Sequence, residues 1–365
     1  MVKLRPEPAT RGPAVFIQLI EFACGSLAIG VAAQHVLLDA RALALFMGDW
    51  ATRARGAHPS PRTYEPLSLD VHAAGDVDAE WADAQLETTA LQIPQLRLDF
   101  WSQRPGHPED VGPAWFSSPR SPAAAIDEQD VASGRRRGRR VPWDDWRWDQ
   151  STLDRTIEFL PEQVEAAYRL AGGDGTSRLD AVLGCVWAAV VRGRDLPPTT
   201  EVRLHTSVDL RRRVTPPLDD TFLGAPLINV MSSSSAGSLT LSSGARAVRA
   251  AVDSLASDAV PALLHHMSFA LDPVREWNCF LGERDVLTTS WLGAGCYDVD
   301  FGFGPPSVVQ PGMPPVDGLL VAMDVPGAAG RREDKWYNSG VRVRLILRKE
   351  VMDKVLADPA LRPEE

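Results

Sequence analysis

Residues 27–54, LAIGVAAQHVLLDARALALFMGDWATRA, contain the change of hydrophobic period that decides the fold of the first part of the chain. From Leu27 to Ala32, larger apolar residues alternate with alanine or glycine, which predicts a β-strand with one buried face. After Asp39 the period becomes that of an amphipathic helix. Its apolar face consists of Leu43, Phe46, Met47, Trp50, Ala51 and Ala54. His35 and Asp39 therefore lie at a predicted strand-to-helix corner, where a side chain can face a cavity.

The spacing of His35 and Asp39 is weak evidence by itself, because the chain contains three His-x-x-x-Asp elements. The others are His72 with Asp76 and His205 with Asp209. The segment around His72, VHAAGDVDAE, has no strand pattern before it and predicts a surface turn. His205 lies inside the strand-like run 202–210, whose end Asp209 is expected to serve. A lone histidine is more often a hydrogen-bonded structural residue, so His35 needs support from a second motif.

The second motif is DFGFG at residues 300–304, near the other end of the chain. Together, HVLLD at 35–39 and DFGFG resemble the motifs of the BAHD acyltransferases, plant and fungal enzymes that move an acyl group from coenzyme A to an alcohol or amine. Three further segments carry the resemblance in order: TSRLDAVLGCVWAAVVR at 176–192, VDLRRRVTPPLDDTFLGA at 208–225 and TTSWLG at 288–293. The resemblance covers nearly the whole chain and is closest in style to the fungal trichothecene 3-O-acetyltransferase-like branch.

The chain departs from the family pattern at four positions. Gln34 replaces a second His before the motif, Ala40 a Gly after it, Phe303 the Trp of DFGWG, and Ala225 an Asn. None of these departures removes His35. Family members carry a much longer segment before the motif than the 34 residues found here, so we expect the chain to be N-terminally truncated.

The resemblance implies an α/β fold of two chloramphenicol-acetyltransferase-like domains, with mixed sheets flanked by helices and the first domain incomplete. Residues 1–104 would be the remainder of the N-terminal domain carrying HxxxD, and residues 153–365 the C-terminal domain carrying DFGFG. Between them, residues 105–152 are rich in Pro, Gly, Ser and charge, which predicts a crossover linker. This linker contains Arg135, Arg136, Arg137, Arg139, Arg140, Trp143, Trp146 and Trp148. We interpret the arginine-rich part of this linker as a solvated loop, with contact to phosphate as the alternative. The tryptophans are expected to pack the extended linker against the domains that it joins.

Local patterns after residue 152 alternate between helix and strand. Pro161 predicts a helix start near Leu160, and Ser177 with Asp180 resembles a capping box at the start of the next helix. Residues 245–255 predict a further helix. Residues 341–347 predict a late strand with Arg342 and Arg344 on its outer face.

Acyl transfer assigns tasks to these residues. A neutral imidazole can take the proton of a hydroxyl as it attacks a thioester, so His35 is the expected general base and no covalent intermediate is needed. The resemblance implies Thr289 and Trp291 as donors to the developing oxyanion, although a Trp in an apolar run is more often part of a core.

Three further expectations concern support of the site. Asp39 is well placed to cap the helix that follows it. The resemblance implies instead, or in addition, an ion pair between Asp39 and Arg211 that holds the corner rigid. Asp300, Gly302 and Gly304 are expected to shape a loop beside the acyl-donor tunnel rather than to react, because the glycines permit a tight path of positive φ.

The expected substrates are acyl-CoA, with acetyl as the acyl group, and a hydroxyl or amine of a small secondary metabolite. No bound cofactor and no metal are expected, since neither HExxH nor paired cysteines occur, and DFG without a Gly-rich loop and HRD is not a kinase motif. A net charge of −10 argues against broad nucleic-acid binding. The absence of a signal-like segment or a long apolar run predicts a cytoplasmic protein, taken as a monomer. The alternatives are a peptide-synthetase condensation domain and a truncated, non-catalytic pseudoenzyme or binding protein of the same fold.

Overall fold

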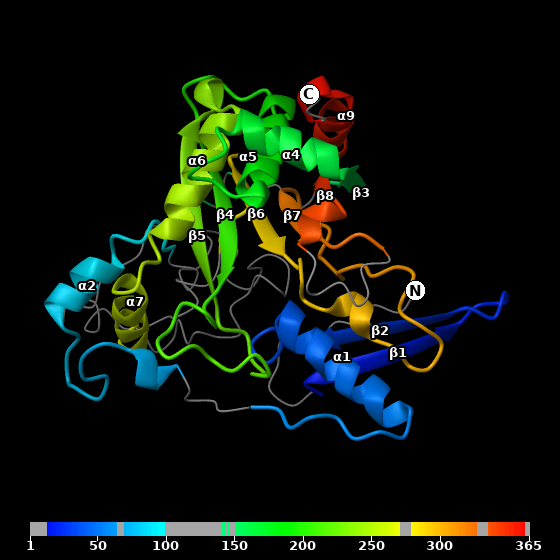
Figure 1. Ribbon diagram of the computed structural model, residues 1–365. Coiled ribbons are helices and arrows are strands. Elements are labelled where there is room, and N and C mark those ends of the chain that lie inside the picture. The colour runs from blue at the N-terminus through cyan, green and yellow to red at the C-terminus, as the bar shows by residue number, and fades with distance from the viewer. Residues whose placement is uncertain are drawn as a thin grey trace, which may run out of the picture.

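The first part of the chain forms a hairpin followed by one long helix. The computed structural model describes residues 13–63, 69–98, 141–142, 145, 150–270, 279–326 and 335–361. Strands β1 (Val15–Glu21) and β2 (Leu27–Ala33) pair in antiparallel register, and helix α1 (Ala40–Ala54) follows β2. The predicted strand-to-helix corner at residues 34–39 is therefore confirmed (Figure 1).

The second part of the described chain is built on a mixed sheet of six strands, in the order β3-β8-β7-β6-β4-β5. In chain order these strands are β3 (Thr152–Phe159), β4 (Glu201–Asp209), β5 (Leu227–Ser235), β6 (Asp285–Ser290), β7 (Leu319–Met323) and β8 (Val341–Arg348). The central strand β6 runs parallel to both of its neighbours, β4 and β7, while the outer pairs are antiparallel. Parallel neighbours bring their carboxyl ends to the same edge of a sheet, where sites commonly form.

One face of this sheet is covered by helices (Figure 1). These are α4 (Pro161–Leu170), α5 (Arg178–Gly193), α6 (Leu241–Asp253) and α9 (Lys349–Ala357). Trp187 of α5 is fully buried in the core that the helices share with the sheet. Two further helices, α2 (Ala84–Ala90) and α7 (Ala259–Ser268), pack against each other beside the sheet. The described residues thus have the mixed α/β architecture that the sequence predicted.

Local signals placed several helix ends correctly. The capping box of Ser177 and Asp180 opens α5, with reciprocal hydrogen bonds of 3.1 and 2.7 Å. Pro161 is the first residue of α4. Helix α6 begins four residues before the predicted position 245, because Thr240 and Ser243 form a further capping box.

One predicted feature of β8 is wrong. Arg342 and Arg344 do point away from the helix-covered face of the sheet. At Arg344, however, the opposite face is buried rather than exposed to solvent. The Arg344 guanidinium is buried and donates to the Asp154 carboxylate of β3, at 2.9 Å from its Nε. A paired charge can be buried, so the sequence rule that arginine marks the outer face failed here.

The crossover linker predicted at residues 105–152 lies almost entirely outside the described residues. So do all five arginines and all three tryptophans singled out in it. Their interpretation therefore stays a prediction.

Close packing of α5 on α6 gives a testable expectation about Gly184. A Cβ at this position would lie 2.5 Å from the backbone nitrogen of Ala245 and 2.6 Å from the carbonyl oxygen of Leu241, closer than such contacts allow. Gly184→Ala should therefore lower the free energy of unfolding by about 1–3 kcal/mol in a urea melt. The matched control is Gly48→Ala in α1, where a Cβ meets nothing within 4 Å and should stabilise by about 0.5–1 kcal/mol. Equal effects at the two sites would contradict this packing argument.

Candidate active site

His35 lies in the turn that joins β2 to α1, and its side chain is exposed. The turn is held by backbone hydrogen bonds from Leu37 and Leu38 to the carbonyl oxygen of Gln34, at 3.0 and 3.3 Å. The backbone position of His35 is therefore set by this corner.

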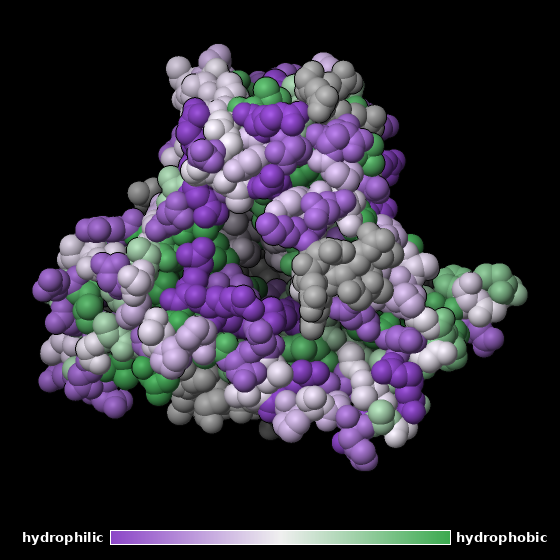
Figure 2. All heavy atoms as spheres, in the orientation of Figure 1, coloured by the Kyte–Doolittle hydropathy of each residue, from purple (hydrophilic) through white to green (hydrophobic). Residues whose placement is uncertain are grey.

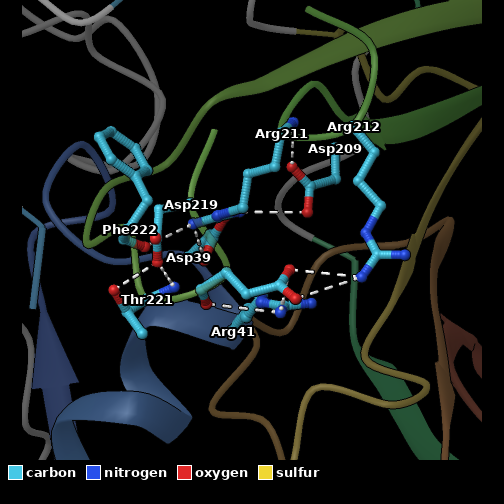
Figure 3. Close-up of polar contacts among 9 residues, drawn as sticks. Asp39, Arg41, Asp209, Arg211, Arg212, Asp219, Thr221 and Phe222 are labelled. Atoms are coloured by element: carbon cyan, nitrogen blue, oxygen red, sulfur yellow. Dashed lines mark hydrogen bonds and ion pairs between the residues drawn. The ribbon is translucent and has the colours of Figure 1, made fainter. Parts of the chain in front are cut away.

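Asp39 fixes the corner from the helix side. Its Oδ1 accepts a hydrogen bond of 2.8 Å from the backbone nitrogen of Ala42, so Asp39 is the N-cap of α1. The same carboxylate accepts two hydrogen bonds from Arg211, 2.6 Å from Nη1 and 3.2 Å from Nη2 (Figure 3). Asp39 is 4% exposed and Arg211 2% exposed. Both expected roles of Asp39, cap and ion-pair partner, are thus combined in one buried carboxylate.

Arg211 connects this corner to the segment between β4 and β5. Its Nη2 donates to the carbonyl oxygen of Gly224 at 2.9 Å, and its Nη1 also lies 3.2 Å from Asp209 Oδ2. Asp209 is the last residue of β4, so it serves the strand end as the sequence predicted. The guanidinium thereby fixes three separate segments around a single point, the end of β4, the β4–β5 connection and the start of α1.

A second ionic contact near this corner was not found from the sequence. Arg41, in the first turn of α1, donates to Asp220 at 2.8 Å, and Arg212 lies 3.3 Å from the same carboxylate. Figure 3 shows the arginines of α1 and of the segment after β4 converging on this region. No local pattern signals the contact, because 179 positions separate Arg41 from Asp220.

The other two His-x-x-x-Asp elements have different surroundings. His72 ends a short 3₁₀ turn, is half-buried, and has its Nδ1 3.2 Å from the carbonyl oxygen of Thr215. His205 is buried inside β4, and its Nε2 lies 3.1 Å from the Asp285 carboxylate. The surface turn and the strand position predicted for them are confirmed. Only His35 follows a strand and precedes a helix anchored by its own Asp.

The DFGFG segment forms a tight loop closed by its first residue. Asp300 Oδ1 accepts hydrogen bonds from the backbone nitrogens of Gly302, at 2.7 Å, and Gly304, at 2.9 Å. Gly302 and Gly304 have φ values of +104° and +94°, which side chains disfavour. The glycines are thus required by the backbone path, as expected for a shaping loop.

The DFGFG loop packs against the far end of α1. The ring of Phe301 meets that of Trp50 edge to face, with centroids 4.9 Å apart. Gly302 approaches Arg55, the residue after the helix, and Figure 1 shows this part of the β6–β7 connection beside α1. Phe303, in the place of the family Trp, is 82% exposed. Helix α1 is therefore held at its N-terminus by Arg211 and at its C-terminus by the DFGFG loop.

The DFGFG loop should weaken in acid. The N–H groups of Gly302 and Gly304 lower the pKa of the Asp300 carboxyl from its ordinary value. A depressed folded pKa stabilises the fold above the unfolded pKa, about 3.9 for Asp, and this contribution is lost as pH falls through the folded pKa. Asp300→Asn should therefore lower the Tm at pH 7, and the difference from wild type should shrink below about pH 4. A difference that stays constant across a calorimetric pH series would contradict this role.

Thr289 and Trp291, the two expected oxyanion donors, lie at the carboxyl end of β6. Thr289 is half-buried within the strand, and Trp291 follows it, with its backbone nitrogen 2.8 Å from the carbonyl oxygen of Ala322. Figure 2 shows a hollow near the centre of the viewed face, where hydrophilic residues gather, and Figure 1 places the ends of β4 and β6 there. These residues thus come from the edge of the sheet that opens toward this hollow.

Within the part of the chain that the structure describes, no group of three His, Cys, Asp or Glu side chains is arranged to hold a metal ion. In the same part, no helix combines the length and the apolar character that crossing a membrane would need.

Known proteins resemble this chain along most of its length. Hydroxycinnamoyltransferase 2 of Oryza sativa is 25% identical over 94% of this chain and 67% of its own length. A hydroxycinnamoyl-CoA:5-hydroxyanthranilate N-hydroxycinnamoyltransferase of Avena sativa is 25% identical over 85% of this chain and 62% of its own length. Among solved structures, F. sporotrichioides TRI101 complexed with coenzyme A and T-2 superposes with a TM-score of 0.59 at 18% identity, covering 96% of this chain and 69% of that one.

The chain therefore spans about two thirds of the length of these relatives. At 18% identity the likeness to TRI101 supports the fold alone, which agrees with the mixed α/β architecture described above. The family assignment comes from the model of the Transferase family, which matches residues 2–92 and 113–361 and so includes both the HxxxD corner and the DFGFG loop. The chain belongs to the Transferase family, the BAHD acyltransferases.

Proposed function

We propose that this chain is an acyl-CoA-dependent acyltransferase in which His35 is the general base. The reaction would move an acyl group, for which we propose acetyl, to a hydroxyl or amine of a small secondary metabolite. Coenzyme A leaves as the thiol, and no acyl-enzyme forms. The observation that carries the proposal is the buried Asp39–Arg211 pair, which holds an exposed histidine at a rigid corner.

The chemistry requires a base whose pKa lies near neutrality and whose position is fixed. A neutral imidazole accepts the proton of the attacking hydroxyl or amine while the new bond to the thioester carbon forms. The Asp39 carboxylate accepts hydrogen bonds from Ala42 and Arg211, which supports a structural role for Asp39 at the corner. Thr289 and Trp291 remain our proposed donors to the thioester oxygen, which gains negative charge as the acceptor attacks.

Other features of the proposal come from the sequence alone. We propose acyl-CoA as co-substrate without a bound cofactor or metal, a monomer located in the cytoplasm, and the domain division 1–104, 105–152 and 153–365. The relatives named above include proteins described as acting with hydroxycinnamoyl-CoA on an amine, so both hydroxyl and amine acceptors belong in the test.

The proposed activity can be tested by thiol release from the purified chain. Acetyl-CoA, benzoyl-CoA and coumaroyl-CoA would each be offered with a panel of alcohols and amines that includes tryptamine, putrescine and agmatine. We expect acceptor-dependent release of free coenzyme A with at least one pair, together with the acylated acceptor by mass spectrometry. If every pair gives only the rate of the protein-free control, the chain is the non-catalytic binding protein and the enzyme proposal is wrong.

A further inference from the structure

Three polar side chains form a row across neighbouring strands of the main sheet. Ser207 of β4 is paired with Asn229 of β5 in antiparallel register. On its other side, β4 runs parallel to β6 with Thr206 opposite Thr288, so the same register places Ser207 beside Thr289. The row Asn229–Ser207–Thr289 therefore crosses three adjacent strands, and its third member is one of the proposed oxyanion donors.

This polar row lies on the face of the sheet that the helices do not cover. Side chains alternate along a strand, and the β4 residues Leu204 and Val208 belong to the core shared with the helices. His205 and Ser207 consequently point to the opposite face, where His205 meets Asp285 of β6. A polar row in the interior of a sheet needs either partners or a ligand.

The neighbouring residues on this face of the sheet pack in apolar clusters, whereas the three residues of the row stay partly exposed. Two residues away along the strands, at the next position on the same face, Met231 and Leu287 join apolar clusters, together with Leu319 and Ile346 of the neighbouring strands. Ser207, Asn229 and Thr289 keep partial exposure although they lie inside strands of a well-packed sheet. They lie near the strand ends that Figure 1 places at the hollow of the viewed face. The row is thus partly accessible at the edge of the sheet that opens toward this hollow.

The hydrogen bond within the row sets its polarity. Ser207 Oγ donates its only hydrogen to Asn229 Oδ1 at 2.7 Å. A hydroxyl oxygen also has two lone pairs, and within the described residues no hydrogen bond is donated to Ser207 Oγ. With its hydrogen committed, Ser207 can offer only an acceptor to a molecule in the opening.

We propose that Ser207, oriented by Asn229, accepts a hydrogen bond from the acceptor substrate and selects acceptors that carry an N–H or O–H donor besides the reacting group. The proposal rests on the proposed acyltransferase function and specifies the substrate class of that site. Because Ser207 lies beside Thr289, the second donor group would be held close to where the thioester oxygen gains charge. The amine or hydroxyl that reacts is a different group from the one that Ser207 recognises.

The test compares acceptors and variants in the thiol-release assay at saturating acyl-CoA. Matched acceptors are butylamine against putrescine and phenethylamine against tyramine, each pair differing by one added donor group. Ser207→Ala should raise the KM of the donor-bearing acceptor by about tenfold, the value of one hydrogen bond, and leave kcat and the KM of acyl-CoA within about twofold. Ser207→Thr, which restores the hydroxyl, should recover most of the wild-type KM.

The control is Thr206→Val, a nearly isosteric change one residue away on the helix-covered face, which should alter none of these constants. A wild-type chain that prefers the simple amine in each pair, or Ser207→Ala with an unchanged KM for the donor-bearing acceptor, would overturn the inference while leaving the acyltransferase proposal intact. A wild-type chain without thiol release would instead contradict the proposed function itself, so the two failures are distinguishable.

Discussion

Replacing His35 with alanine is expected to lower kcat for thiol release by a factor of about 10² to 10⁴, the usual contribution of a positioned general base. The KM values for both substrates should change little, because the imidazole acts on a proton that moves only in the reaction. The side chain is exposed and lies in a turn, so the variant should fold with a Tm close to that of wild type. Steady-state kinetics and a thermal melt on the same preparation would measure both effects.

The matched control for His35 is His72. Both histidines begin a His-x-x-x-Asp element and both lie in turns, His35 exposed and His72 half-buried, so His72→Ala changes the same chemistry in a different place. We expect His72→Ala to keep wild-type kcat. Activity that survives in His35→Ala, or that falls equally in both variants, would remove His35 from the role of base.

Asp39→Ala is expected to lower the free energy of unfolding by about 3–5 kcal/mol. The substitution leaves the Arg211 guanidinium buried without its principal counter-charge, which is the expensive way to break an internal ion pair. It also removes the N-cap of α1, which contributes on the order of 1 kcal/mol. Chemical denaturation monitored by circular dichroism would measure the loss, and kcat should fall as well, since the corner that positions His35 loosens.

Two further variants separate the buried pair from general effects at Arg211. Asp209→Ala removes a carboxylate that also contacts Arg211 but is 42% exposed, and such pairs contribute at most about 1 kcal/mol. The double variant Asp39→Leu with Arg211→Met replaces both charges by apolar groups and should be more stable than Asp39→Leu alone. If Asp39→Ala costs no more than Asp209→Ala, the ion pair does not hold the corner.

The sequence predicted those parts of the fold that short-range patterns determine. The change from period two to period 3.6 around His35 placed β2 and α1, and the capping box at Ser177 placed the start of α5. The burial of Arg344 was missed because its partner Asp154, which compensates for the burial of the charge, lies 190 positions away. No local pattern encodes such a pairing. Short-range rules therefore fail first where distant charges meet.

In the candidate site, too, the features carried by sequence motifs were predicted, and the contacts between distant segments that no motif carries were not. The family resemblance predicted the contact between Asp39 and Arg211, and the glycines of DFGFG predicted a loop with positive φ values. The partnership of Ser207 with Asn229 was not anticipated, because it depends on the register between two strands rather than on either strand alone. The contact of Arg41 with Asp220 was missed because 179 positions separate the two residues.

The clamping of α1 at both ends has a consequence for the order of folding. Asp39 and Arg211 are separated by 172 positions, and the contact of Trp50 with Phe301 joins segments still further apart in the chain. Closing such long loops costs chain entropy before their contacts contribute any stability, so they form slowly. After residue 150, β4 pairs with β5 and β7 pairs with β8 through much shorter loops, whereas β3 pairs with β8 across a separation as long as that between Asp39 and Arg211. The histidine corner is therefore completed after these short-range strand pairs, and a refolding chain would regain part of its sheet before it regains its reaction centre.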